Sequence, residues 1–200
     1  MKLVELYTLL INSLIFQNFF SVLKALDETL LLLLISLPIG FVLSLLFALC
    51  RVSKYKLFSK PIAMYIFVIR GTPLLVQIYL IYFGLGSVKA IRESFLWIVL
   101  KEPFWCGVIA LTINTVAYGS EIFRGGIQAV SKGQIESGKS LGFSIIKLYR
   151  RIIFPIALRK VLPTYGNELI LMVKATSLVS LTTYMEMTGI ARKLMAKTFA

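Results

Sequence analysis

The feature that most constrains this chain is an uncharged apolar run that extends from Thr29 to Cys50. A helix rises about 1.5 Å per residue, so about twenty apolar residues cross a hydrocarbon core about 30 Å thick. The composition agrees, because 58% of the 200 residues are hydrophobic and 16% are charged, whereas soluble domains are about 45–50% apolar. The sequence therefore predicts an all-α fold, a polytopic bundle of membrane helices.

Three further segments are expected to cross the membrane, and these are Pro61–Phe83, Pro103–Ser120 and Val161–Met185. The first of them is interrupted by Arg70 and the turn that follows it. The last contains Glu168 and Lys174. A charge at the centre of a membrane helix costs about 2.5–3.5 kcal/mol, so both side chains are expected to face protein or water. Four spans are predicted in all.

The amino-terminal residues 1–28 contain one more uncharged stretch, Leu6–Leu23. Only a few residues separate it from the run that begins at Thr29. We therefore expect a helix that lies in the membrane interface in preference to a separate crossing.

The charges are distributed unevenly along the chain, whose net charge is +13. Segments 51–60 and 121–160 carry net charges of +4 and +6, against −1 for residues 1–28 and +1 for residues 85–102. The positive-inside rule places the two basic segments in the cytoplasm and the amino terminus in the periplasm. Membrane lipid and a protein partner are expected to meet the basic surface. Nucleic acid is not expected, because no extended soluble surface is available to bind it.

Reactive side chains are few. The chain has no histidine, and Cys50 and Cys106 lie far apart in apolar stretches. Their spacing matches neither a CxxC pair nor a set of zinc ligands. We therefore expect two buried thiols, with no metal site, no disulfide and no catalytic residue.

The segment 121–160 contains a motif that suggests nucleotide binding. Gly133 to Ser140 matches GxxxxGK[ST], the loop that cradles phosphates in P-loop proteins. That motif requires a buried β-strand before it and a helix after it, and here it follows the end of an expected membrane helix. We expect no ATP binding by this chain. The enzymatic alternative is a membrane-tethered ATPase that uses Lys139.

A second pattern in the same segment contains a glutamate and two small residues, a glycine, an isoleucine and a proline. These residues are Glu136, Ser137, Gly138, Gly142, Ile152 and Pro155. Their spacing resembles the EAA motif of importer-type ABC transporter permeases. The small Ser137 and Gly138 stand in place of two alanines, and Phe154 stands in place of a leucine.

Other stretches resemble the polar amino acid branch of the same family, over about residues 25–200. They are Arg70–Gln77, Tyr118–Gln128, Leu162–Ile170, Val173–Ser180 and Met185–Arg192. The last two are most similar to permeases for histidine, lysine, arginine and opines. The resemblance implies a non-catalytic permease subunit in the plasma membrane of a bacterium, which is the inner membrane if the bacterium is Gram-negative.

The resemblance also implies partners. The chain would form the translocation pathway for polar amino acids with an identical or homologous second permease, and would receive them from a periplasmic or lipid-anchored binding protein. It would hold no cofactor itself, since ATP would be hydrolysed on a separate ATPase subunit. Residues 121–160 would be the segment that couples to this ATPase, with Glu136 and Gly142 as key positions. A solvated basic loop is the alternative.

Polar side chains near the membrane midplane are the candidates for lining the pathway. They are Gln77, Glu168, Lys174, Thr176 and Ser177. Lys174 would hold the carboxylate of the substrate, or it would extend to the interface. Arg70 is expected to bond to the carbonyls that the break at Gly71 and Pro73 frees, with a flexible joint beside the pathway as the alternative. Many family members have an acidic residue where Ala175 stands, so the resemblance carries no carboxylate to that position.

One departure concerns the carboxyl-terminal region. Family members continue past the position of Ala200 into a final hydrophobic span. Residues 161–200 are therefore expected to hold the fourth span and a truncated end, so that four spans are present where the family has five. An ion-coupled secondary transporter or a channel subunit would also explain a charged fourth span, but it would not explain the EAA-like spacing.

Overall fold

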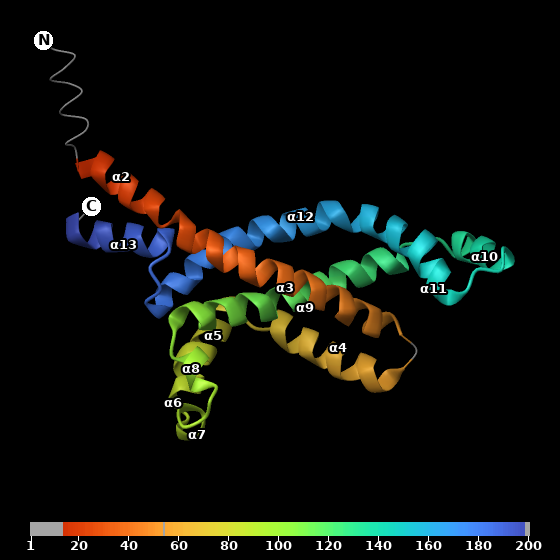
Figure 1. Ribbon diagram of the computed structural model, residues 1–200, viewed down its shortest axis with the longest axis horizontal. Coiled ribbons are helices and arrows are strands. Elements are labelled where there is room, and N and C mark those ends of the chain that lie inside the picture. The colour runs from red at the N-terminus through yellow and green to blue at the C-terminus, as the bar shows by residue number, and fades with distance from the viewer. Residues whose placement is uncertain (1–13, 54, 199–200) are drawn as a thin grey trace, which may run out of the picture. The chain divides into compact units, whose positions relative to one another are not determined.

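The computed structural model describes residues 14–53 and 55–198. The helices in chain order (Figure 1) are α2 (Leu14–Lys24), α3 (Leu26–Val52), α4 (Lys56–Arg70), α5 (Leu74–Tyr79), α6 (Leu85–Ser87), α7 (Lys89–Arg92), α8 (Trp97–Leu100), α9 (Pro103–Gln128), α10 (Lys132–Ser140), α11 (Ile145–Leu148), α12 (Phe154–Val179) and α13 (Met187–Thr198). Two π-helical turns, η1 (Leu80–Gly84) and η2 (Tyr149–Ile153), and one 3-10 turn, η3 (Ser180–Thr182), join some of them. No strand occurs in these described ranges, and the predicted all-α fold is confirmed.

Two of the described helices are long and apolar enough to cross a membrane, Asn18–Val52 and Pro103–Gln128. A third crossing results if the pair Lys56–Arg70 and Leu74–Ser87 is one span, although the two are bent by 103°. This break lies where the sequence predicted an interruption. Helix α12 has 26 residues, which is enough to span, but it does not meet the same apolar standard. Its charged residues, predicted to face protein or water, lower its hydropathy.

The helices extend beyond the segments that hydropathy marks. Helix α9 continues eight residues past Ser120, to Gln128, and α12 begins at Phe154 instead of Val161. At the amino terminus α2 continues into α3 with only Ala25 between them. The expectation that residues 1–28 lie in the interface stays a prediction, and residues 1–13 lie outside the described part of the chain.

The chain divides into two compact units. The first comprises Met1–Ile35, Ile78–Val108 and Lys174–Ala200, and the second comprises Ser36–Gln77 and Ile109–Val173. The core of the second unit contains buried side chains from α3, α9 and α12, which are Ala48, Phe123, Val161 and Tyr165. The ring of Phe41 packs edge-on against Phe123 and Tyr165, with centroid distances of 5.3 and 5.4 Å. Such edge-to-face pairs contribute about 0.5–1.5 kcal/mol beyond the free energy gained by burying their surface area.

Small residues let α3 and α9 approach closely in the second unit. A Cβ on Gly40 would lie 2.6 Å from Cγ2 of Thr115, and the hydroxyl of Ser44 donates a 3.1 Å hydrogen bond to the Thr115 carbonyl. Close approach of small residues is the usual way in which membrane helices associate, because lipid supplies no hydrophobic driving force between them.

In the first unit a buried carboxylate joins α13 to the start of α3. Glu186, 1% exposed, accepts hydrogen bonds of 2.9 Å from the backbone N–H groups of Thr188 and Gly189. These donors lie in the first turn of α13, where no intrahelical acceptor is available. The hydroxyl of Thr29 on α3 donates to the same carboxylate at 3.5 Å and accepts from the N–H of Met187 at 3.2 Å.

The two cysteines are free. Cys106 is buried and its thiol donates to the Leu100 carbonyl at 3.2 Å. Cys50 is half-buried, so the prediction of two buried thiols is wrong for this residue.

Candidate functional site

Helix α10 contains the first three residues of the EAA-like motif and is capped at both ends by local hydrogen bonds. At its start the hydroxyl of Ser131 accepts from the N–H of Gln134 at 3.4 Å. At its end the N–H of Phe143 donates to the Gly138 carbonyl and the N–H of Gly142 donates to the Lys139 carbonyl, at 3.1 and 2.9 Å. These two bonds form a Schellman motif, whose left-handed residue is usually glycine. Gly142 has φ +72° and fills that role.

The residues that match the P-loop pattern, Gly133 to Ser140, all lie within α10. Residues 132–140 are helical from Lys132 to Ser140, and no strand precedes them within the described ranges. A helix directs its backbone N–H groups along its own axis, so they cannot form the phosphate-binding loop of that motif. The geometry agrees with the expectation that this chain does not bind ATP through Lys139.

Gly138 packs against two side chains that follow it in the sequence. A Cβ on Gly138 would lie 2.6 Å from Cδ1 of Leu148 and 2.6 Å from Cδ1 of Ile152. Glycine in place of the motif's usual alanine therefore permits the backbone of α10 to contact α11 and η2. The structure thus brings together Gly138 and Ile152, two positions of the motif that are fourteen residues apart.

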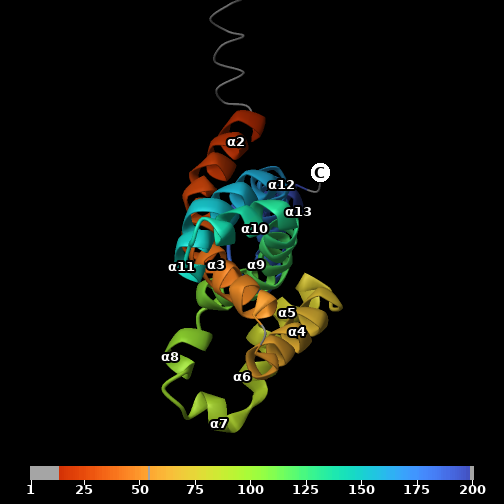
Figure 2. The same cartoon turned by 90° about the vertical axis from the view of Figure 1, so that its right-hand side faces the viewer.

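A hydrophobic cluster ties this region to the ends of two long helices. Its buried members are Ile127 in the last turn of α9, Val130 just after that helix, Leu148 at the end of α11, Ile153 in η2 and Ala157 in α12. Partly buried residues such as Ile135, Phe143 and Ile152 pack against it. Side chains from α9, α10 and α12 therefore pack in one cluster. Helices α10 and α11 lie next to each other at this end of the second unit (Figure 2).

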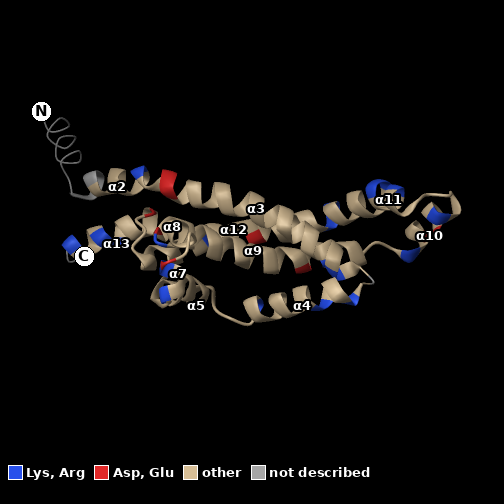
Figure 3. Cartoon of the chain, turned by 60° about the horizontal axis from the view of Figure 1, so that its bottom comes forward, with Lys and Arg blue, Asp and Glu red and all other residues tan. Residues whose placement is uncertain are grey.

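The outer face of the same region is exposed. Glu136, Ser137 and Pro155 are exposed, and three large apolar side chains are 73–81% exposed, namely Leu141, Ile145 and Ile146. Lysines and arginines gather on α10 and α11 around them (Figure 3). Apolar side chains surrounded by charged residues mark surfaces that contact a partner.

The helix break between α4 and α5 is held by Gln77. Proline has no N–H group, so Pro73 leaves the carbonyl of Ile69 without its helical donor. The side-chain amide of Gln77 donates to that carbonyl at 2.8 Å and to the Thr72 carbonyl and hydroxyl at 3.1 and 2.9 Å. Asn114 on α9 donates to the Gln77 side-chain oxygen at 3.5 Å.

The expectation that Arg70 bonds to the freed carbonyls is therefore wrong, because Gln77 supplies that donor. The guanidinium of Arg70 instead lies 5.1 Å from the centroid of the Tyr118 ring. Gln77, expected among the pathway residues, is buried and its amide is fully occupied by the break.

We expect Gln77→Leu to lower the thermal unfolding midpoint of the protein in detergent. Leucine has a similar volume but removes the side-chain hydrogen bonds to Ile69 and Thr72, and each such bond contributes about 0.5–1.5 kcal/mol. The midpoint is measured by fluorescence of the native tryptophans. Gln134→Leu, on the exposed part of α10, is the matched control, and equal midpoints for the two variants would contradict the assignment.

The other pathway candidates occupy both units. Glu168, in the second unit, is 7% exposed and its charge interacts with that of Arg70. In the first unit, Thr176 is 2% exposed and Lys174 is exposed. The hydroxyl of Ser177 donates to the Lys174 carbonyl at 2.6 Å, a local bond within α12.

Sequence reasoning missed an ionic network around Glu121. One carboxylate oxygen of Glu121 accepts from Nε and Nη2 of Arg124 at 2.9 and 2.6 Å. The other lies 3.6 Å from Nε of Arg51. The three-residue spacing of Glu121 and Arg124 on a helix was a readable signal, whereas nothing local pointed to Arg51, seventy residues earlier.

The long apolar helices and the exposed helices between α9 and α12 define a class of protein. It is the class of polytopic helical membrane proteins with an exposed helical segment between two long helices. A family model narrows the class, since the model described as "Binding-protein-dependent transport system inner membrane component" matches residues 10–196. The chain belongs to this family and is a permease subunit of an ABC transport system, as the EAA-like spacing predicted.

Individual relatives agree. The octopine transport system permease protein OccM of Rhizobium radiobacter is 48% identical over 92% of this chain and 76% of its own length. The histidine/lysine/arginine/ornithine permease HisM of Escherichia coli K12 is 43% identical over 86% of this chain and 72% of its own length. A solved structure, "Crystal structure of an amino acid ABC transporter with histidines", superposes with a TM-score of 0.78 at 38% identity, covering 90% of this chain and 79% of that one. None of these comparisons supports an ion-coupled transporter.

Proposed function

We propose that the chain is the membrane pathway of an importer for cationic amino acids or opines, and that a separate ATPase drives it by docking on α10 and α11. ATP would be bound and hydrolysed on that partner. A second permease chain and a periplasmic or lipid-anchored binding protein would complete the importer, in the inner membrane of a bacterium.

The observation that carries the coupling role is the construction of the α10–α11 region. Its inner face is fixed to the ends of α9 and α12 by a shared hydrophobic cluster, whereas its outer face exposes Leu141, Ile145 and Ile146. A partner that binds the outer face therefore moves two long helices through the inner face. Glu136, Ser137, Gly138, Gly142, Ile152 and Pro155 are the residues to which we assign this coupling.

The substrate class follows from the relatives and from one buried charge. The relatives carry names for octopine, for histidine, lysine, arginine and ornithine, and for arginine. Glu168 is buried and its charge interacts with that of Arg70; we propose that a cationic substrate competes with Arg70 for this carboxylate. We propose Gln77, Glu168, Lys174, Thr176 and Ser177 as the polar residues along the pathway, with Gln77 acting through the helix break.

Glu136→Arg is expected to reduce both the ATPase activity that co-purifies with the tagged chain and the ATP-dependent uptake of labelled arginine by about tenfold. Glu136 is exposed on α10, so charge reversal leaves the fold intact and places a cation where the partner meets a carboxylate. A tenfold loss corresponds to about 1.4 kcal/mol of binding free energy. Labelled leucine tests the substrate class in the unmodified protein.

Glu93→Arg is the matched control, because Glu93 is also exposed but lies in the first unit. It should leave both measurements within about twofold of the unmodified chain. Unchanged ATPase recovery and uptake in Glu136→Arg would contradict the coupling role. Equal uptake of leucine and arginine would contradict the substrate class alone.

A further inference from the structure

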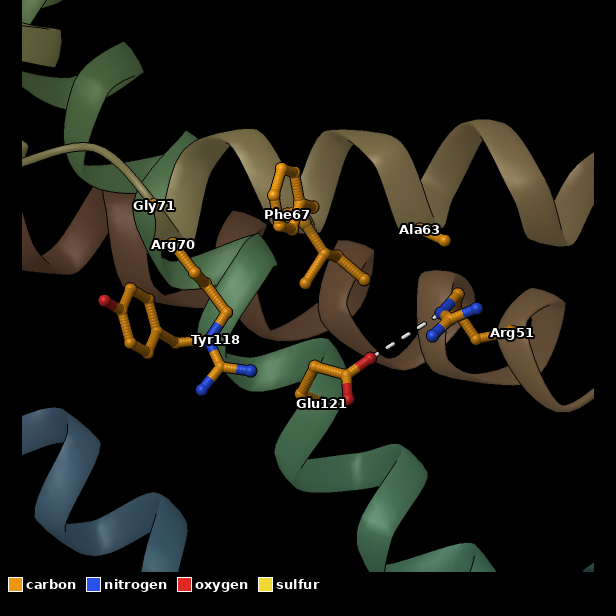
Figure 4. A pocket seen from close by; sticks show the side chains of 8 residues that line it. Arg51, Ala63, Phe67, Arg70, Gly71, Tyr118 and Glu121 are labelled. Atoms are coloured by element: carbon orange, nitrogen blue, oxygen red, sulfur yellow. Dashed lines mark ion pairs between the residues drawn. The ribbon is translucent and has the colours of Figure 1, made fainter.

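The second unit contains an open pocket of about 500 Å³ between α3, α4 and α9. Figure 4 shows two guanidinium groups, from Arg51 and Arg70, on either side of the Glu121 carboxylate, with Tyr118 beside Arg70. Ala63 and Phe67 contribute apolar wall from α4. This pocket lies apart from the α10–α11 region.

The pocket carries an excess of positive charge. Glu121 is already paired with Arg124, which lies outside the pocket lining, and with Arg51 at a longer 3.6 Å. Arg70 is exposed and forms no ion pair with any residue that the structure describes. Its donors are available to an anion, since a contact with an aromatic face leaves the guanidinium N–H groups free at the edge.

The part of the pocket that Arg51 and Glu121 form lies at a depth where lipid phosphates are expected. Glu121 is eighteen residues beyond Pro103, the start of α9, and this distance is about 27 Å along a helix. The hydrocarbon core is about 30 Å thick, so Glu121 lies near its far boundary. Arg51 is the penultimate residue of α3 and begins the basic segment 51–60, which the positive-inside rule assigns to the cytoplasm.

Next to the pocket α4 presents apolar side chains outward. Phe67, Met64 and Val68 are 75%, 63% and 44% exposed. A long hydrocarbon chain suits such a face, whereas a small hydrophilic solute gains nothing from it. The combination of a cationic pocket and an adjacent exposed apolar face on a membrane helix favours a lipid as the occupant.

We propose that this pocket binds the phosphate group of an anionic phospholipid, with Arg70 and Arg51 as donors. Guanidinium groups match phosphate oxygens with paired hydrogen bonds. The lipid supplies an anion at ion-pair distance, which Arg70 does not have among the described residues. This proposal does not depend on the substrate or on the ATPase partner.

The test is native mass spectrometry of the purified full chain in detergent with added phosphatidylglycerol or phosphatidylcholine. The unmodified chain should retain phosphatidylglycerol in preference to phosphatidylcholine. Arg70→Gln should retain about fivefold less phosphatidylglycerol, as expected for the loss of one basic contact to an anionic lipid. Arg159→Gln, which removes an equal charge from an exposed position on α12 outside the pocket, should change retention by less than about twofold.

Ala63→Leu serves as a second variant that fills the pocket without changing any charge, and it should also reduce retention. Equal retention of the two lipids, or equal effects of Arg70→Gln and Arg159→Gln, would overturn the proposal. Displacement of the bound lipid by free arginine, with arginine binding lost in Arg70→Gln, would assign the pocket to a solute and likewise overturn it. If Arg70→Gln does not fold, unchanged retention in Ala63→Leu overturns it.

Discussion

Gly138→Leu is expected to abolish ATP-dependent uptake and to release the ATPase, with losses greater than about tenfold. Even a Cβ at this position would lie 2.6 Å from Leu148 and from Ile152, so a leucine side chain must displace α10 from its neighbours. Overpacking of this kind costs about 1–3 kcal/mol. Because α10 shares a cluster with the ends of α9 and α12, its displacement breaks the connection between the docking surface and the membrane helices. Uptake of labelled arginine and co-purifying ATPase activity are the measurements.

Gly133→Leu is the matched control in the same helix. Nothing lies within 4 Å of a Cβ at Gly133, and both substitutions raise helix propensity by a similar amount, about 1 kcal/mol. The difference between the two variants therefore isolates the steric effect at Gly138. Uptake that is equally normal in both would show that close packing of α10 against η2 is not required for coupling.

Gly126→Leu is expected to destabilise the second unit by about 2–3 kcal/mol, at the upper end of the overpacking range. A Cβ at Gly126 would collide with Cγ2 of Val161 and would lie 3.1 Å from the carbonyl oxygen of Ala157. The carbonyl belongs to the backbone of α12 and cannot rotate away, so the two helices must separate. The thermal unfolding midpoint in detergent measures the effect.

The adjacent Gly125 provides the control, since a Cβ there meets nothing within 4 Å. Gly125→Leu should match the unmodified midpoint or exceed it, because glycine weakens a helix interior. A midpoint for Gly126→Leu equal to that of Gly125→Leu would mean that α9 and α12 do not pack through this glycine in the membrane protein.

The positions of α3 and α9 could be read from hydropathy, because a charged side chain inside a membrane is costly. Their ends could not. Helix α9 continues past Ser120 to Gln128 and α12 begins at Phe154, since a helix that leaves the bilayer keeps its backbone bonds while its side chains become polar. Hydropathy therefore marks the lipid-facing part of a helix and not the whole helix.

At the candidate site, the spacing of the EAA-like motif was a better guide to the structure than the chemical type of single polar residues. The motif placed Gly138, Gly142 and Ile152 in one segment, and the structure gives reasons for two of them, a close approach at Gly138 and a left-handed backbone at Gly142. The prediction that Arg70 is the donor at the helix break was wrong, because the side chain of Gln77 folds back onto Ile69 and Thr72, and no local pattern indicates which polar side chain does so. The ionic network of Glu121 joins residues from α3 and α9. A local sequence pattern can therefore indicate only its Glu121–Arg124 part.

The contact between Thr29 and Glu186 has a consequence for the order of synthesis. The two residues are 157 positions apart, and a chain emerges from the ribosome with its amino terminus first. Thr29 therefore enters the membrane long before Glu186 exists. Its hydroxyl also lies 3.3 Å from the carbonyl of Ala25, the residue that precedes α3, and it can donate its one proton there until Glu186 is made. The start of α3 is complete as a helix from the beginning, and it acquires its lasting partner only when nearly all of the protein has been made.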